Sequence, residues 1–189
     1  VRRALSLLER ARGQYGSLQT LGEVVHNRLV VERLAAQGIS PARSIAELLG
    51  PAVAITTHGV GPQIWAELKS SSWPIVDATC PWVSRAQRAA QRLAAAGFSV
   101  MVFGDADHPE VKGVLEWAGE GSWATQNPDI ARWPAPVKLG PAPFPRRLGI
   151  LSQTTQSPQR FAEFVKKIVG IFLPRGIEIR IVNTICDAT

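Results

Sequence analysis

The feature that most constrains the fold is a unit of apolar strand, short polar turn and helix that recurs along the chain. In its clearest copy an apolar run ends in the turn DATCP at 77–81, and the pattern SRAQRAAQRLAAAG at 84–97 predicts a helix. A second strand and turn lie at 177–189, where IEIRIV leads into NTICDAT. Strands that alternate with helices favour parallel α/β units, so we predict an α/β fold with mostly parallel sheets.

Apolar periodicity and turn residues predict the remaining elements of the chain. Strands are predicted at 18–25, 52–57, 73–77, 99–103, 123–125, 148–151 and 177–182, and helices at 1–14, 28–37, 44–49, 61–69, 84–97, 109–118, 127–133 and 158–173. A proline-rich connector is expected over 134–147.

Composition excludes several classes of protein. No apolar run approaches the ~20 residues of a membrane span, and the start has no signal-peptide pattern. The net charge of +6 permits an anionic ligand, but the arginines are scattered over predicted helix faces, which does not favour nucleic-acid binding. Two distant cysteines do not resemble a secreted disulfide framework, so we expect a reducing, cytoplasmic location.

Both ends of the sequence suggest an internal fragment of a longer protein. The first residue is valine, the only methionine is Met101, and the helical pattern is already established at residue 2. The last predicted strand is followed by a turn and nothing more. We therefore expect further segments on both sides.

Side chains that can bind a metal or a phosphate or transfer a proton follow the predicted strands. All three histidines and both cysteines lie in such turns, together with one glutamate and a pair of threonines: His26, His58, Cys80, His108, Glu110, Thr154, Thr155 and Cys186. The carboxyl ends of parallel strands meet at one edge of a sheet, where ligands bind in open α/β folds. We therefore expect these side chains to converge.

Each residue also has a purely structural interpretation. A lone cysteine is most often a small buried apolar group, a histidine after a strand can be a structural hydrogen-bonding group, and Thr154 and Thr155 can cap the next helix. Together, however, imidazoles and turn N–H groups suit a phosphate, a carboxyl two residues from a histidine suits proton delivery, and thiolates suit a soft metal. Two thiolates are too few for an iron–sulfur cluster, which would need another cysteine from elsewhere.

Two other functions stay open on this chemistry. One is a zinc-dependent hydrolase that uses Cys80, His26 and His108. The other is a non-enzymatic, phosphate-binding α/β module in which the cysteines are inert core residues.

Six motifs resemble the 4-hydroxy-3-methylbut-2-enyl diphosphate reductase family (IspH/LytB). They are GEVVHNRLVVERL at 22–34, THGV at 57–60, DATCPWV at 77–83, HPEVKG at 108–113, SQTT at 152–155 and NTICDAT at 183–189. The resemblance covers essentially the whole sequence, with the motifs in family order.

The resemblance implies repeated three-layer α/β domains arranged like a trefoil around a central [4Fe–4S] cluster that three cysteines hold. Cys80 and Cys186 match the second and third of these ligands, and the first is absent from the 189 residues. The implied domains are 1–80, which is truncated at its N-terminus, 81–183, and 184–189 as the start of a truncated third domain.

The resemblance also implies roles for the turn residues. His26, His58, His108 and Thr154 match substrate-binding residues, Glu110 matches the proton donor, and Thr154 matches the threonine that helps relay or position the hydroxyl. The implied reaction is the reductive dehydroxylation of 4-hydroxy-3-methylbut-2-enyl diphosphate to isopentenyl and dimethylallyl diphosphates, the last step of the methylerythritol phosphate route to isoprenoids. The implied partners are this substrate and an electron donor such as flavodoxin or ferredoxin, without nucleic acid or membrane. The family's later Ser-Ser-Asn segment is missing, so we expect the fragment alone to be inactive.

Overall fold

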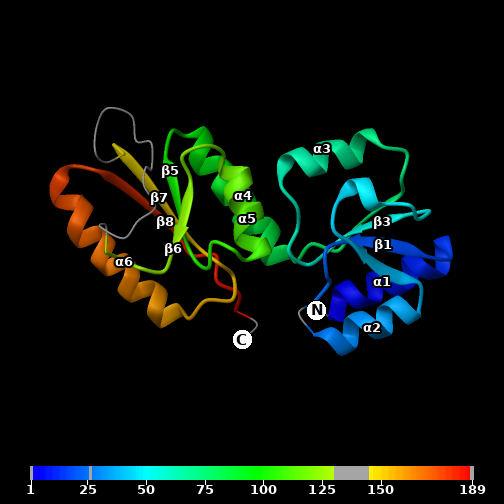
Figure 1. Cartoon of the computed structure of the whole chain (residues 1–189). Coiled ribbons are helices and arrows are strands. Elements are labelled where there is room, and N and C mark those ends of the chain that lie inside the picture. Colours follow the sequence, from blue (N-terminus) through cyan, green and yellow to red (C-terminus); the bar gives the residue numbers. More distant parts are fainter. Residues whose placement is uncertain (1, 26, 130–144, 188–189) are drawn as a thin grey trace. The chain divides into compact units, whose positions relative to one another are not determined.

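The computed structural model of the chain describes residues 2–25, 27–129 and 145–187 (Figure 1). The chain divides into two compact units, Val1–Pro81 (unit 1) and Trp82–Thr189 (unit 2). Each unit is a four-stranded sheet with helices on both faces, and every strand pairing in the described part of the chain is parallel. The predicted α/β class with parallel sheets is confirmed.

Unit 1 has the strand order β2-β1-β3-β4. Its elements are α1 (Arg2–Tyr15), β1 (Leu18–Leu21), α2 (Arg28–Ala36), β2 (Ile39–Ala42), the 3₁₀ turn η1 (Ile45–Glu47), β3 (Val53–Ile55), α3 (Pro62–Ser70) and β4 (Ile75–Asp77). Leu8 of α1 and Leu34 of α2 pack with Ala54 on one face of the sheet, whereas Leu68 of α3 packs with Val53 and Ile55 on the other. The unit is therefore three-layered, with α1 and α2 opposite α3 (Figure 1).

Strand β2 was not predicted from the sequence. It pairs with β1 through four residues and includes Pro41, which lies opposite Thr20. Proline has no N–H to donate, so in sheets it is confined to edge strands and strand ends, and β2 is an edge strand. The expected strand 18–25 ends early, at Leu21, because the backbone turns at Gly22, whose φ is +80°.

Unit 2 repeats this topology with the order β6-β5-β7-β8. Its elements are α4 (Pro81–Ala95), β5 (Ser99–Phe103), α5 (Pro109–Ala118), β6 (Trp123–Thr125), β7 (Arg147–Ser152), α6 (Pro158–Phe172), the 3₁₀ turn η3 (Leu173–Arg175) and β8 (Glu178–Val182). Alternation along β5 divides its side chains between two cores: Val102 packs with α4 and α5, and Phe103 packs with α6. The expected helix 127–133 and connector 134–147 lie largely outside the described residues.

A charged cluster closes the amino end of the unit 2 sheet. The guanidinium groups of Arg147 and Arg180 lie 4.4 and 4.6 Å from the centre of the Phe98 ring. Arg147 Nε donates to Glu178 Oε2 at 2.7 Å, and this hydrogen bond lowers the pKa of the exposed Glu178 carboxyl. This end is opposite the turns that carry the predicted site residues, so we assign the cluster a structural role.

Among the helices described, none combines the length and the apolar character that crossing a membrane requires.

Candidate functional site

The strand order of each unit creates a topological switch point. The first and third strands are neighbours, β1 beside β3 and β5 beside β7, and the connections from these pairs leave toward opposite faces of the sheet. In open α/β sheets such a point opens a crevice outside the carboxyl ends of the strands, which is where ligands bind.

At the switch point of unit 2, Glu110 and Thr154 form a buried pair. Glu110 lies in the first turn of α5 and is 2% exposed, and Thr154 follows β7 and is 4% exposed. Thr154 donates to both carboxyl oxygens: its N–H to Oε1 at 2.6 Å and its Oγ1–H to Oε2 at 2.8 Å. The structure thus brings together two of the residues predicted for the site, and a buried carboxyl that accepts two hydrogen bonds is held in one orientation.

His108 is oriented by the same helix start. It is the N-cap of α5, with Pro109 at the first helical position, and its Nδ1 accepts a hydrogen bond from the Glu110 N–H at 3.1 Å. Because Nδ1 is the acceptor, the neutral imidazole carries its proton on Nε2, which is a donor. The half-buried ring is therefore a fixed donor two residues before the carboxyl.

Gln153 joins the two turns of this switch point and was not predicted as a site residue. It is 4% exposed; its N–H donates to Phe103 O at 2.9 Å, and its Oε1 accepts from Asp105 N at 3.1 Å. The turn after β5 is therefore anchored to the turn after β7. Its place beside Thr154 in the SQTT motif was the one sequence signal that could have identified it.

Gly104 is required for this close approach, which gives a first prediction. A Cβ at Gly104 would lie 2.8 Å from Gln153 Cβ and 3.1 Å from Val111 Cγ2. Gly104→Ala is therefore expected to lower the free energy of unfolding by about 1–3 kcal/mol through overpacking, as measured by urea denaturation. The matched control is Gly170→Ala in α6, where nothing lies within 4 Å and alanine should stabilise the helix slightly. Equal effects of the two substitutions would contradict the close approach.

The cysteines occupy equivalent positions in the two units. Each follows the fourth strand, Cys80 after β4 and Cys186 after β8, and both are half-buried thiols. Cys80 N donates to Thr57 O at 3.0 Å, and Cys186 N donates to Thr154 O at 2.8 Å. In both units the accepting threonine lies two residues beyond the end of the third strand.

The switch point of unit 1 carries the remaining predicted residues. Half-buried His58 follows β3 in a tight turn, in which Gly59 adopts φ +70° and donates to Thr56 O at 3.1 Å. Thr57 Oγ1 donates to Val24 O at 3.1 Å and so ties this turn to the segment after β1. His26 lies outside the described residues, four positions after Gly22, as His108 lies four positions after Gly104.

The predicted site is thus divided between the units. Unit 1 holds His58 and Cys80, and unit 2 holds His108, Glu110, Thr154 and Cys186. Within the described ranges, no three His, Cys, Asp or Glu side chains gather closely enough to hold a metal ion. The expected convergence of all these turns on one cavity stays a prediction.

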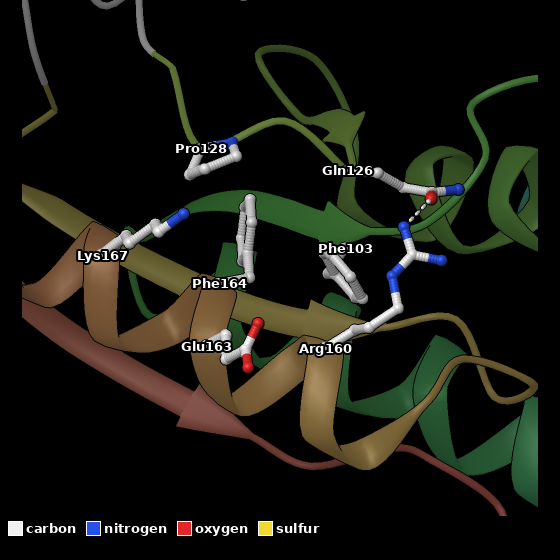
Figure 2. Close-up of a pocket in the computed structure, with 7 residues that line it drawn as sticks. All are labelled: Phe103, Gln126, Pro128, Arg160, Glu163, Phe164 and Lys167. Atoms are coloured by element: carbon white, nitrogen blue, oxygen red, sulfur yellow. Dashed lines mark hydrogen bonds between the residues drawn. The ribbon is translucent and has the colours of Figure 1, made fainter.

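A hollow of about 120 Å³ lies elsewhere in unit 2, between α6 and the turn after β6 (Figure 2). It is lined by Phe103, Gln126, Pro128, Arg160, Glu163, Phe164 and Lys167. Arg160 Nη2 donates to Gln126 Oε1 at 3.1 Å across its rim, as Figure 2 shows. It contains none of the predicted site residues.

Comparison with known proteins identifies the family. The family model described as LytB protein matches residues 1–189. A relative from Dehalococcoides mccartyi (strain CBDB1), named 4-hydroxy-3-methylbut-2-enyl diphosphate reductase, is 46% identical over 187 residues, which cover 98% of this chain and 63% of the relative. A relative of the same name from Geobacter metallireducens is 37% identical over 190 residues, again covering 63% of its length.

Solved structures agree with the sequence relatives. A structure of (E)-4-hydroxy-3-methyl-but-2-enyl diphosphate reductase, described as the terminal enzyme of the non-mevalonate pathway, matches 99% of this chain and 64% of its own, with a TM-score of 0.77 and 32% identity. A structure of the E-1-hydroxy-2-methyl-but-2-enyl-4-diphosphate reductase from Plasmodium falciparum matches with a TM-score of 0.85 and 25% identity, over 100% of this chain and 57% of its own.

The chain therefore spans 63% of the length of these curated relatives. The resemblance seen in the sequence motifs is confirmed, and neither the zinc hydrolase nor the phosphate-binding module is favoured. Over its whole length, this chain belongs to the LytB family.

Proposed function

We propose that this chain is part of a reductase that removes the hydroxyl group of 4-hydroxy-3-methylbut-2-enyl diphosphate. One observation carries the proposal: a continuous path of hydrogen bonds joins the buried carboxyl of Glu110 to the backbone of Cys186. Thr154 donates to Glu110 through its N–H and hydroxyl, and its carbonyl accepts from the Cys186 N–H. The proposed proton donor and the proposed metal ligand are thus both hydrogen-bonded to Thr154.

The donor set suits an iron–sulfur cluster. Thiolates are the ligands that such clusters take, and this chain places a half-buried thiol at the same point of each unit. We propose that Cys80 and Cys186 hold a [4Fe–4S] cluster, with a third cysteine from outside these 189 residues. When bound, the cluster would supply electrons and a Lewis-acidic iron for the leaving hydroxyl.

Glu110 would deliver the proton that turns the hydroxyl into a leaving water molecule. Loss of the hydroxyl takes two electrons and two protons: the C–O bond breaks, one proton leaves with the oxygen as water, and the other ends on carbon. Protonated Glu110 can give the first of these protons from a carboxyl oxygen. Thr154 would hold this carboxyl in place through its contacts with the two carboxyl oxygens.

The imidazoles would bind the diphosphate end of the substrate. His108 presents its Nε2–H donor, and His58 lies in the turn before α3, whose N-terminus has no side-chain cap. Helix N-termini and imidazoles both favour a phosphate group, and the net charge of +6 suits an anionic substrate. We include His26 in this set on its sequence position alone.

The remaining predictions are part of the same proposal. Residues 1–80 and 81–183 would form the first two domains, and 184–189 the start of a third. Electrons would come from a small redox protein such as flavodoxin or ferredoxin, in the cytoplasm.

The direct test is turnover by a protein of the relatives' full length. It would be purified without oxygen and supplied with 4-hydroxy-3-methylbut-2-enyl diphosphate and a chemically reduced dye. The expected result is oxidation of the dye together with formation of isopentenyl and dimethylallyl diphosphates. Substrate left unchanged by protein that carries its full iron and sulfide would contradict the proposal.

Thr154→Val tests the role of the threonine hydroxyl. Valine keeps the shape but removes the hydrogen bond to Glu110 Oε2, so kcat is expected to fall about 10- to 100-fold, the equivalent of one hydrogen bond to a charged group. KM should change little, and Thr154→Ser should restore most of kcat. The control is Thr125→Val, which removes a half-buried hydroxyl that hydrogen-bonds to the Asn127 backbone. A change in KM alone would contradict the role in proton transfer.

A further inference from the structure

The two cysteine turns share a hydrogen-bond pattern. The turns are DATC at 77–80 and NTIC at 183–186, and the cysteine is the one residue that both carry at the same position. In unit 1, Asp77 Oδ1 accepts from Thr79 N at 2.9 Å. In unit 2, Asn183 Oδ1 accepts from Ile185 N at 3.0 Å. In each turn, therefore, a side-chain oxygen three residues before the cysteine holds the N–H of the residue immediately before it.

We infer that Asp77 and Asn183 are positioning residues that fix the direction of the Cys80 and Cys186 thiols. The inference rests on the proposed function only in taking these thiols as iron ligands. Each turn is closed from both sides, since the cysteine N–H itself donates to the threonine that follows the third strand. The two hydrogen bonds leave the cysteine backbone little freedom, and the Cα–Cβ bond then points one way.

A side-chain acceptor is needed because, in the described part of the chain, no strand lies on the outer side of β4 and β8, the two edge strands that precede the turns. Thr79 and Ile185 lie beyond the last residue of an edge strand, which has a neighbouring strand on one side only. Thr79 is only 8% and Ile185 only 5% exposed, so water is a poor substitute for the lost partner. Short polar side chains commonly take over at such points, and an unsatisfied buried N–H is costly.

The other hydrogen bonds that hold the two turns differ between the units. In unit 1, Arg3 Nη1 donates to Thr79 O at 3.2 Å. In unit 2, the fully buried Thr184 hydroxyl bonds to Ser152, accepting from its N–H at 3.0 Å and donating to its carbonyl. The side-chain acceptor three residues before the cysteine and the cysteine-to-threonine hydrogen bond are present in both turns. The common requirement is therefore the geometry of the cysteine rather than general support of the loop.

Alkylation of the metal-free chain tests the inference, with each cysteine serving as the reference for the other. The rates of reaction of Cys80 and Cys186 with N-ethylmaleimide would be followed separately by peptide mass spectrometry. Asp77→Ala should speed Cys80 about fivefold, as expected for loss of one hydrogen bond, and leave Cys186 within about twofold. Asn183→Ala should do the reverse. Asp77→Asn and Asn183→Asp keep the acceptor and should behave as the parent chain.

Two results would overturn the inference: an alanine variant that changes both cysteines alike, or an acceptor-keeping variant that behaves like alanine. If Asp77→Ala fails to fold by circular dichroism, Asn183→Ala and the two exchange variants still decide the question.

Iron loading of a full-length protein separates this inference from the proposed function. The iron content of the parent protein tests the proposed function. The iron content of Asp77→Ala, divided by that of Asp77→Asn, tests the positioning role. We expect less iron, and a weaker visible absorbance, in the alanine variant only. Equal iron in these two variants would overturn the positioning role even if the parent protein proved to be the reductase.

Discussion

Glu110→Gln is expected to lower kcat of the full-length reductase about 100- to 10,000-fold, the usual contribution of a positioned general acid. Glutamine keeps the volume of the side chain, and its one carbonyl oxygen can still accept the Thr154 N–H, but it has no acidic proton to give. Substrate binding should persist, because the imidazoles rather than the carboxyl are proposed to hold the diphosphate. The measurement is anaerobic turnover with a reduced dye, alongside substrate affinity by calorimetry.

A matched control lies on the same helix. Glu116 in α5 is exposed, so Glu116→Gln should leave kcat within about twofold, as surface substitutions usually do. If Glu110→Gln kept kcat within threefold of the parent enzyme, another group would be the acid, and the buried pair with Thr154 would be structural.

Cys80→Ser and Cys186→Ser are expected to remove most of the bound iron and sulfide and to lower the activity at least about 100-fold. Even changes to residues that only support a metal ligand lower metal affinity or activity 10- to 100-fold. Serine oxygen is a poor ligand for a cluster that takes thiolates. Iron, acid-labile sulfide and visible absorbance would be measured after anaerobic reconstitution. Both variants should lose iron alike, because both thiols are proposed to bind one cluster.

The same variants should fold normally without metal. Both cysteines are half-buried, and replacing sulfur by oxygen there changes little packing, so the free energy of unfolding of the metal-free chain should stay within about 1 kcal/mol. Full iron content in either variant would contradict the ligand assignment. Loss of folding in the metal-free form would instead show that the thiol is a core group.

The sequence predicted the fold class because the two hydrophobic periods alternate clearly along the chain. Strand β2 was not predicted because Pro41 interrupts its four-residue run. The proline is tolerated there because β2 is an edge strand. Periodicity also carries no information on strand order. The placing of β1 beside β3 and β5 beside β7, which creates the switch points, is visible only in the structure.

The candidate site was predictable in part because the alternating pattern shows which turns follow the parallel strands. Turns after parallel strands share an edge, and this places Glu110 beside Thr154 across the β5–β7 switch point. Gln153 was not predicted because glutamine has no distinctive chemistry, and its role depends on the missing Cβ of Gly104. The likeness of the two cysteine turns was hidden because aspartate and asparagine offer the same acceptor oxygen in different sequences.

No pattern in the sequence fixes how the two units pack, since that depends on surfaces rather than on periodicity. Crystallography of an anaerobically purified, full-length protein, with anomalous data collected at the iron absorption edge, would therefore decide where the iron lies relative to the two thiols. We expect one compact iron peak bonded to both Cys80 Sγ and Cys186 Sγ, with Glu110 and His108 lining the adjoining cavity. Iron bound away from either thiol, or the two thiols buried in separate places, would contradict this expectation.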